Sequence, residues 1–163
     1  MEERNKAASD HEVYLTYTFS TPREMVFKAW TDPKQLVKWY APHNCTIVYK
    51  KLDIRKRGEY LSCINNPQYG DCWCKGVYKE VIFPERIEFT MVVSDKDGNT
   101  VDPVKAGMDP DWPMETLVSI TFSEENGKTT IKLRQTVSQK LATKTGAYPS
   151  WIQMLERLAE EIK

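Results

Sequence analysis

Few side chains of this sequence could carry out catalysis, and none belongs to a recognisable catalytic motif. The two histidines are His11, near the N-terminus, and His43, directly after Pro42 in an expected loop. The sequence has no G-x-S-x-G or H-E-x-x-H motif and no glycine-rich phosphate loop. Glu80 is the candidate general acid or base, because burial on its strand would raise its pKa. A rim carboxylate paired with a Lys or Arg is the simpler interpretation, so we assign no catalytic residue.

The four cysteines are the other reactive groups: Cys45, Cys63, Cys72 and Cys74. Cys72 and Cys74 are two residues apart in an expected strand, so both thiols point to one face. With His43 and Cys45 they could form a metal site, but the paired C-x-x-C spacing of structural zinc sites is absent. We therefore expect reduced thiols that pack as small apolar side chains, with no metal and no cofactor.

Basic residues gather in one short segment, with only Asp53 opposing them. They are Lys50, Lys51, Arg55, Lys56 and Arg57. Such a cluster could meet an acidic surface of a protein partner, for example a chaperone, and a solvated hairpin is the simpler interpretation. Over the whole chain 23 basic residues balance 23 acidic ones, so the net charge is zero. This balance argues against a nucleic-acid-binding protein, which usually carries a basic excess.

The N-terminal third predicts a strand followed by two short helices. Apolar and polar residues alternate from Val13 to Phe19, which is typical of a half-buried strand. Residues 21–24 (TPRE) form a capping box with proline at the first helical position. Asp32 and Pro33 repeat a helix start eleven residues later, and Leu36 and Trp39 are expected to be buried from that second helix.

The middle of the chain predicts only strands, joined by turns too short for parallel crossovers. The Asn126-Gly127 pair is the strongest of these turn signals. The strands are expected at 46–54, 59–64, 72–83, 87–93, 117–122 and 129–137. Residues 95–113 form a long loop rich in Gly, Pro and Asp, which could be a lid carrying Trp112 or a mobile hairpin tip.

The C-terminal segment predicts a long amphipathic helix from Pro149 onward. Its apolar stripe consists of Trp151, Leu155, Leu158 and Ile162. With 163 residues the chain suits one domain, expected over 12–163, after a flexible leader at 1–11. No apolar run approaches the roughly 20 residues of a membrane span, and no signal-peptide core is present. We therefore expect a cytoplasmic protein without membrane insertion.

This order of elements predicts an α+β fold in which the last helix lies across a curved antiparallel sheet of about seven strands. A straight helix touches a curved sheet more readily at its rims than at its deepest point, so we expect an apolar cavity between them. Inward-facing large side chains are the candidate ligand-binding residues, although each could equally be plain core. They are Tyr60, Trp73, Phe89, Met91, Trp112, Ile120, Trp151 and Leu155.

Five segments, in order, resemble the motifs of one family, the heat-shock-protein ATPase activator homologues (AHSA-type). They are residues 21–33 (TPREMVFKAWTDP), 36–42 (LVKWYAP), 53–60 (DIRKRGEY), 76–87 (GVYKEVIFPERI) and 151–159 (WIQMLERLA). The sequence departs from the family pattern at Tyr40 and Glu59, where tryptophan and glycine are usual, and at Ser150, where glycine usually precedes the helix tryptophan. That family belongs to the START/Bet v 1-like (SRPBCC) superfamily, so the resemblance implies a helix-grip fold.

The resemblance leaves three functions open, since the superfamily includes carriers, cyclases and co-chaperone domains. The first expectation is non-catalytic binding of a hydrophobic small molecule or lipid in the cavity, by a monomer or weak homodimer. The alternative is a stress-related, co-chaperone-like module that contacts a chaperone. The second alternative is an enzyme of the cyclase or dehydratase type, for which Glu80 would be tested first.

Overall fold

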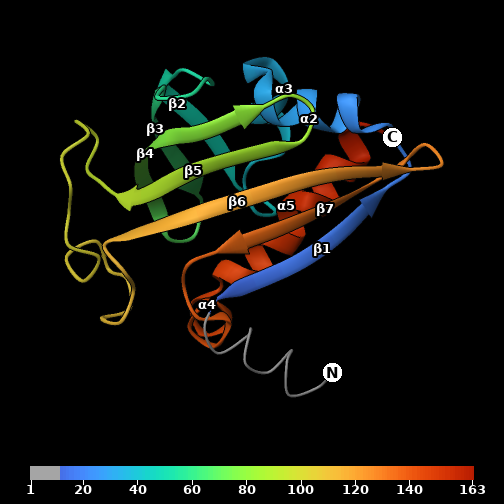
Figure 1. Ribbon diagram of the computed structural model, residues 1–163. Coiled ribbons are helices and arrows are strands. Elements are labelled where there is room, and N and C mark those ends of the chain that lie inside the picture. The colour runs from blue at the N-terminus through green and yellow to red at the C-terminus, as the bar shows by residue number, and fades with distance from the viewer. Residues whose placement is uncertain (1–11) are drawn as a thin grey trace.

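The computed structural model describes residues 12–163, so the leader expected at 1–11 lies outside the described residues. Strand β1 (Val13–Phe19) is followed by helices α2 (Arg23–Thr31) and α3 (Pro33–Trp39). Six strands come next: β2 (Thr46–Leu52), β3 (Glu59–Asn66), β4 (Gly70–Ile82), β5 (Arg86–Val93), β6 (Glu115–Glu125) and β7 (Lys128–Gln135). Helices α4 (Gln139–Thr145) and α5 (Ala147–Glu161) complete the fold (Figure 1).

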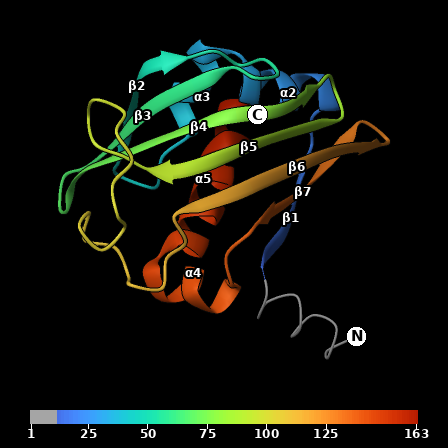
Figure 2. The same cartoon turned by 60° about the vertical axis from the view of Figure 1, so that its left-hand side comes forward.

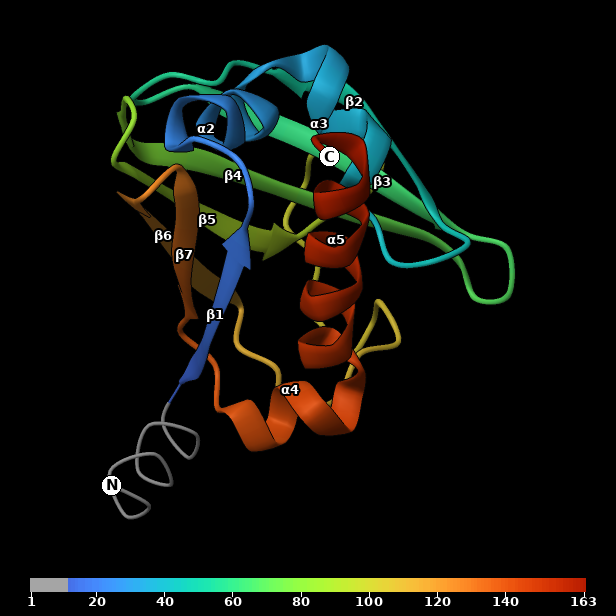
Figure 3. The same cartoon turned by 90° about the vertical axis from the view of Figure 1, so that its right-hand side faces the viewer.

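The strands form one seven-stranded antiparallel sheet in the order β1-β7-β6-β5-β4-β3-β2. Each strand from β2 to β7 lies beside the next in the chain, while β1 pairs with β7. Figure 3 shows the sheet curving around α5, with α2 and α3 packed at one end of that helix. The predicted α+β architecture is confirmed, including the two short helices and the long last helix. None of the helices within residues 12–163 combines the length and the apolar character needed to span a bilayer.

The two short helices begin by different means. Asp32 caps α3 as predicted, because its Oδ1 accepts the Lys34 N–H at 2.9 Å. The capping box predicted for α2 is wrong: Thr21 makes no cap hydrogen bond, and its hydroxyl instead donates to the Ile162 carbonyl at 3.3 Å. The Arg23 N–H donates to Glu124 Oε1 at 2.7 Å, so the β6–β7 hairpin satisfies this donor at the start of α2.

The sheet bends sharply where β4 passes Gly76. A Cβ at this position would lie 1.9 Å from the Thr90 carbonyl oxygen and 2.7 Å from Cε1 of the Tyr60 ring, so only glycine fits. The register of β4 against β5 shifts between Tyr78 and Glu80, as expected of a β-bulge. In this part of the sheet Tyr60 of β3 and Tyr78 of β4 line one cavity together with Trp30, Leu36 and Tyr40 of the helical side.

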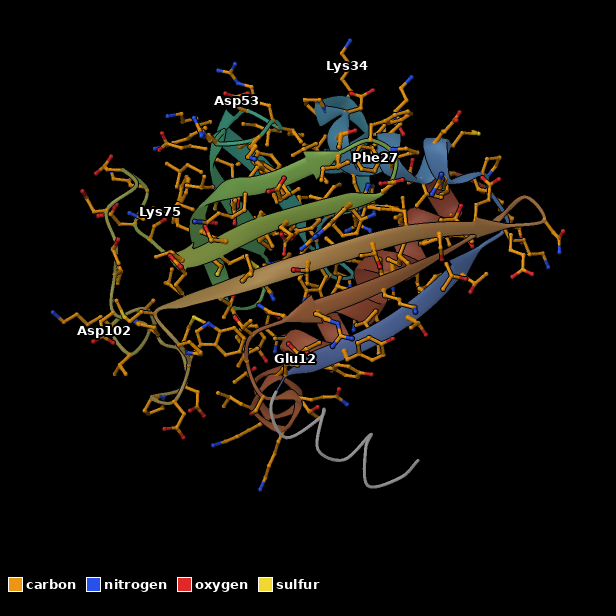
Figure 4. All side chains as sticks on the ribbon, in the orientation of Figure 1. Glu12, Phe27, Lys34, Asp53, Lys75 and Asp102 are labelled. Carbon is orange, nitrogen blue, oxygen red and sulfur yellow. The ribbon has the colours of Figure 1, made fainter. Side chains whose placement is uncertain are left out.

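The C-terminal region contains one helix more than the pattern from Pro149 predicted. Ser138 caps α4 by accepting the Leu141 N–H at 3.1 Å. Gly146, with φ of 90°, then separates α4 from α5, and such a left-handed conformation favours glycine. The longest loop, between β5 and β6, extends beyond the sheet, as Figures 2 and 4 show, and Asp102 lies on it. Lys144 of α4 holds this loop through an ion pair of 3.0 Å with Asp109.

Candidate functional site

The space beneath α5, where we expected a cavity, is occupied by a buried polar network. The Trp151 indole N–H donates to Gln135 Oε1 at 2.9 Å, and Gln135 Nε2 donates to Thr116 Oγ1 at 3.1 Å. The exposed fractions of the three residues are 3%, 2% and 1%. Ile120 and Leu155 are fully buried in the same region. The helix therefore packs tightly on the sheet, and the predicted position of the cavity is wrong.

A small cavity lies instead between the sheet and the two short helices. Its walls come from α2, α3 with the residue that follows it, and strands β2–β5; the lining residues are Trp30, Leu36, Tyr40, Tyr49, Tyr60, Tyr78, Ile87 and Phe89. We call it the tyrosine cavity. The volume open to the centre of a water-sized sphere is about 10 Å³, which corresponds to one water molecule. In this conformation the cavity is closed, and a larger guest requires its walls to move.

Two of the eight predicted binding residues, Tyr60 and Phe89, line the tyrosine cavity. Ile120, Leu155 and Trp151 belong to the packed core described above. The remaining three also lie outside the wall: Met91 contacts the Gln135 amide nitrogen at 3.8 Å, Trp112 is half-buried against the core, and Trp73 carries the Lys50 ammonium 4.9 Å from its ring centre.

Sequence reasoning missed the other six lining residues, above all Tyr40, Tyr49 and Tyr78. A signal for two of them was present, because Tyr49 and Tyr78 occupy inward positions of strands where a packed core ordinarily uses Val, Ile or Leu. Tyrosine at such a position brings a hydroxyl that needs a partner. Tyr40 follows the end of α3, and strand periodicity cannot place it.

The aromatic walls meet mostly edge to face. The centre of the Tyr60 ring lies 5.8 Å from that of Tyr78, 6.1 Å from Phe89 and 6.5 Å from Tyr49. Trp30 lies 6.0 Å from Tyr40 on the opposite, helical side. Aromatic pairs at these separations stabilise each other beyond their buried area, by about 0.5–1.5 kcal/mol per pair. The rings of the wall thus stabilise one another.

The polar atoms of this wall are unevenly satisfied. The Tyr60 hydroxyl donates to the Thr90 carbonyl at 2.6 Å and lies 3.7 Å from Cys74 Sγ. The Trp30 side chain is only 3% exposed, and its indole N–H has no hydrogen-bond partner within residues 12–163. A buried donor without a partner costs about 1–3 kcal/mol, which marks this position as unusual.

Burial keeps the phenols of the tyrosine cavity protonated. It raises the pKa of Tyr40, Tyr49 and Tyr60 well above the ordinary value, and the neighbouring phenols and Cys74 add to the effect. Burial likewise raises the pKa of Tyr78, and it raises that of the Cys74 thiol to about 12. The wall is therefore uncharged at neutral pH, and Cys74 is a protonated, unreactive thiol.

Helix α5 holds the segment that closes the cavity on one side. The Arg157 Nη1 donates to the carbonyls of Ala41 at 2.6 Å, Pro42 at 3.2 Å and Cys45 at 3.3 Å. Its Nη2 donates to the backbone carbonyl of Lys38 at 3.0 Å. One guanidinium thus satisfies carbonyls at the end of α3 and in the following loop. Residues 38–45 are therefore fastened to α5, and Tyr40 with them.

The charged candidates are paired at the surface. Glu80 lies 3.6 Å from Lys56 Nζ, so the interpretation as a rim carboxylate is confirmed. Lys51 pairs with Glu59 at 3.5 Å, and Arg55 pairs with Asp53 at 2.9 Å on the outer turn labelled in Figure 4. The predicted basic cluster is thus interleaved with carboxylates. Within residues 12–163 no three His, Cys, Asp or Glu side chains gather as metal ligands, and all four thiols are unpaired.

The two widest of the described grooves lie outside the core. One, of about 560 Å³, runs between the long loop and α4, and the other, of about 400 Å³, lies at the sheet bend beside Gly76 and Met114. Both are open to solvent. Neither contains a buried polar group without a partner, unlike the tyrosine cavity.

These features define a protein class: an antiparallel sheet that grips a C-terminal helix, with two short helices after the first strand, is the START/Bet v 1-like helix-grip fold. Residues 20–163 match the model of the family described as activator of Hsp90 ATPase homolog 1-like protein. The chain belongs to this family, as its motifs had suggested.

Solved structures confirm the fold. A protein from Staphylococcus epidermidis is 22% identical, with a TM-score of 0.76 over 94% of this chain and 90% of its own. One from Chromobacterium violaceum is also 22% identical, with a TM-score of 0.75 over 93% and 96%. An AHSA1 protein from Silicibacter pomeroyi is 20% identical, with a TM-score of 0.72 over 92% and 96%. No curated protein matches the sequence.

Proposed function

We propose that this protein binds a small, mostly apolar molecule in the tyrosine cavity without catalysing a reaction on it. The observation that carries the proposal is Trp30, which lines that cavity and whose buried indole N–H has no hydrogen-bond partner among residues 12–163. A core built only for stability would place a hydrocarbon side chain there or supply an acceptor. A bound molecule with a suitable atom would supply that acceptor.

The tyrosines support the same proposal. Four phenols line one cavity, and only the Tyr60 hydroxyl donates to a buried backbone carbonyl. Ligand sites commonly combine apolar walls with a few convergent polar groups, and tyrosine provides both properties. The domain of 12–163 is large enough to bury such a site.

Binding requires the closed cavity to open, and the helical wall is the side suited to move. Leu36 and Tyr40 belong to α3, a helix of seven residues, and to the loop after it. This wall is fastened to α5 through side-chain hydrogen bonds, whereas the opposite wall is part of the continuous sheet. A ligand that binds the opened form would shift the population toward it.

The test is an NMR titration of the uniformly ¹⁵N-labelled protein with one-ring and two-ring aromatic molecules. We expect shifts at the cavity residues, including the indole resonance of Trp30, and none at the indole of Trp73 on the outer face. Ile87→Phe, which fills the cavity, should abolish the shifts, while the exposed control Val48→Phe should retain them. Shifts confined to the two open grooves, or no shifts with any probe, would refute the proposal.

A chaperone-directed role is the second candidate, and the match to the family of Hsp90 ATPase activator homologues favours it. In the predicted basic cluster Lys51, Arg55 and Lys56 are paired with carboxylates at the exposed surface, so a partner would have to compete with these weak ion pairs. The direct measurement is the ATP hydrolysis rate of a purified Hsp90-type chaperone with and without this protein. An unchanged rate would exclude activation. The cytoplasmic location and the monomeric or weakly dimeric state stay predictions.

A further inference from the structure

The polar atoms of the tyrosine cavity limit which ligands it can hold, beyond its apolar character. The Trp30 indole nitrogen can only donate a hydrogen bond, and the phenols of Tyr40, Tyr49 and Tyr78 can donate one as well. The backbone acceptor beside the cavity, the Thr90 carbonyl, already receives the Tyr60 hydroxyl at 2.6 Å. The phenol oxygens can also accept, so among the eight lining residues the Trp30 indole is the group that can pair only with an acceptor.

The same wall carries no formal charge. None of its eight lining residues is Asp, Glu, Lys, Arg or His. A ligand cation would find no carboxylate, and a ligand anion would find no ammonium or guanidinium, because the nearby Arg157 guanidinium is committed to four backbone carbonyls. Burying an unpaired charge is far more costly than burying a neutral polar group.

We infer that the cavity selects uncharged molecules whose polar atom is a hydrogen-bond acceptor, and that the Trp30 indole N–H is the donor that reads this atom. The inference rests on the proposed binding function and specifies its ligand class: an aromatic or aliphatic body with a ketone, ester or ether oxygen. The Trp30 ring packs against Trp39 and Tyr40, with ring centres 4.6 and 6.0 Å away.

Three probes of similar shape separate the effects on binding of a hydrogen-bond acceptor, of an apolar group and of a negative charge. They are acetophenone, α-methylstyrene and benzoate. Acetophenone carries a carbonyl where α-methylstyrene carries an isosteric C=CH₂ group, and benzoate adds a negative charge. The quantity to compare is the ratio of the Kd of α-methylstyrene to that of acetophenone, measured by NMR titration at pH 7. Comparing this ratio between variants cancels the greater hydrophobicity of the alkene.

Removal of the donor should lower that ratio. For Trp30→Phe we expect a decrease of about 3- to 10-fold, as for the loss of one hydrogen bond. Trp73→Phe is the matched control, since it makes the same substitution outside the cavity wall, and its ratio should equal that of the wild type. The Trp30 indole proton should move downfield with acetophenone and not with α-methylstyrene. Benzoate should bind most weakly.

The outcomes distinguish this inference from the proposed function. Binding of both neutral probes with the same ratio in Trp30→Phe and the wild type would overturn the acceptor selectivity and leave the binding function standing. Tighter binding of benzoate than of acetophenone would overturn the requirement for an uncharged ligand. If none of the three probes binds up to its solubility limit, the proposed function and this inference both fail.

Discussion

The buried network between α5 and the sheet allows a sharp test of what fastens the last helix. In Gln135→Leu the Trp151 indole N–H loses its acceptor at 2.9 Å, and Thr116 Oγ1 loses its donor at 3.1 Å. Water cannot replace either partner easily, because all three residues are almost fully buried. Each of the two orphaned groups costs about 1–3 kcal/mol, so we expect a loss of about 2–6 kcal/mol in the free energy of unfolding.

Urea unfolding at 25 °C, followed by tryptophan fluorescence and circular dichroism, measures this change. The matched control is the double variant Gln135→Leu with Trp151→Phe, which removes donor and acceptor together. Its loss should be smaller than the sum of the two single losses, since the Trp151 N–H and Gln135 Oε1, each orphaned in one single variant, are both absent, while Thr116 Oγ1 lacks its donor in both variants that carry Gln135→Leu. A loss below about 0.5 kcal/mol in Gln135→Leu, or strictly additive losses, would show that the network does not fasten the helix.

Three further predictions concern the ends of helices and the buried phenols. Arg157→Met should lower the free energy of unfolding by about 1–3 kcal/mol, because it removes four hydrogen bonds to carbonyls. It should also speed amide hydrogen exchange in residues 38–45. Unchanged exchange there would contradict the role of the guanidinium. Glu124→Ala should cost about 1 kcal/mol by uncapping α2, measured by urea unfolding beside the control Glu125→Ala. The contribution of the raised pKa values to the free energy of unfolding should be fully present below pH 9 and should be lost as the pH rises toward 12. In that range the unfolded chain releases protons that the folded chain retains on the buried tyrosines and on Cys74, whose folded pKa is about 12. Urea midpoints that stay constant from about pH 8 to 11 would refute this.

Local patterns predicted the secondary structure well where neighbours in sequence determine it. Alternation predicted β1, and the predicted cap of α3 by Asp32 is present. The Asn126-Gly127 turn joins β6 to β7 as predicted, with both residues at positive φ. The cap of α2 could not be predicted in this way, since its acceptor is Glu124, 101 residues away in sequence. No local pattern reports a contact that only the folded sheet creates.

The position of the cavity depends on a further property that periodicity does not contain. Alternation indicates which side chains face inward, but it does not indicate how far each strand lies from the helix. That distance depends on local irregularities of the strands, such as the close approach at Gly76 and the register shift after Tyr78, which a single glycine in a long strand pattern only hints at. Curvature alone therefore predicted a void in the wrong place.

The size of the void follows from what fills it. Beneath α5 the large Trp151 side chain and the Gln135 amide occupy the deepest part of the sheet, so curvature there leaves no space. At the bend the gap is filled by rings, and their rigid outlines leave a small residual volume where aliphatic side chains would have adapted by changing rotamer. Rings leave gaps of fixed shape, and phenols leave hydroxyls at the edges of those gaps. A helix-grip chain that places several tyrosines at inward strand positions should therefore keep a polar-edged cavity near the bend, even when the region under the helix is solid.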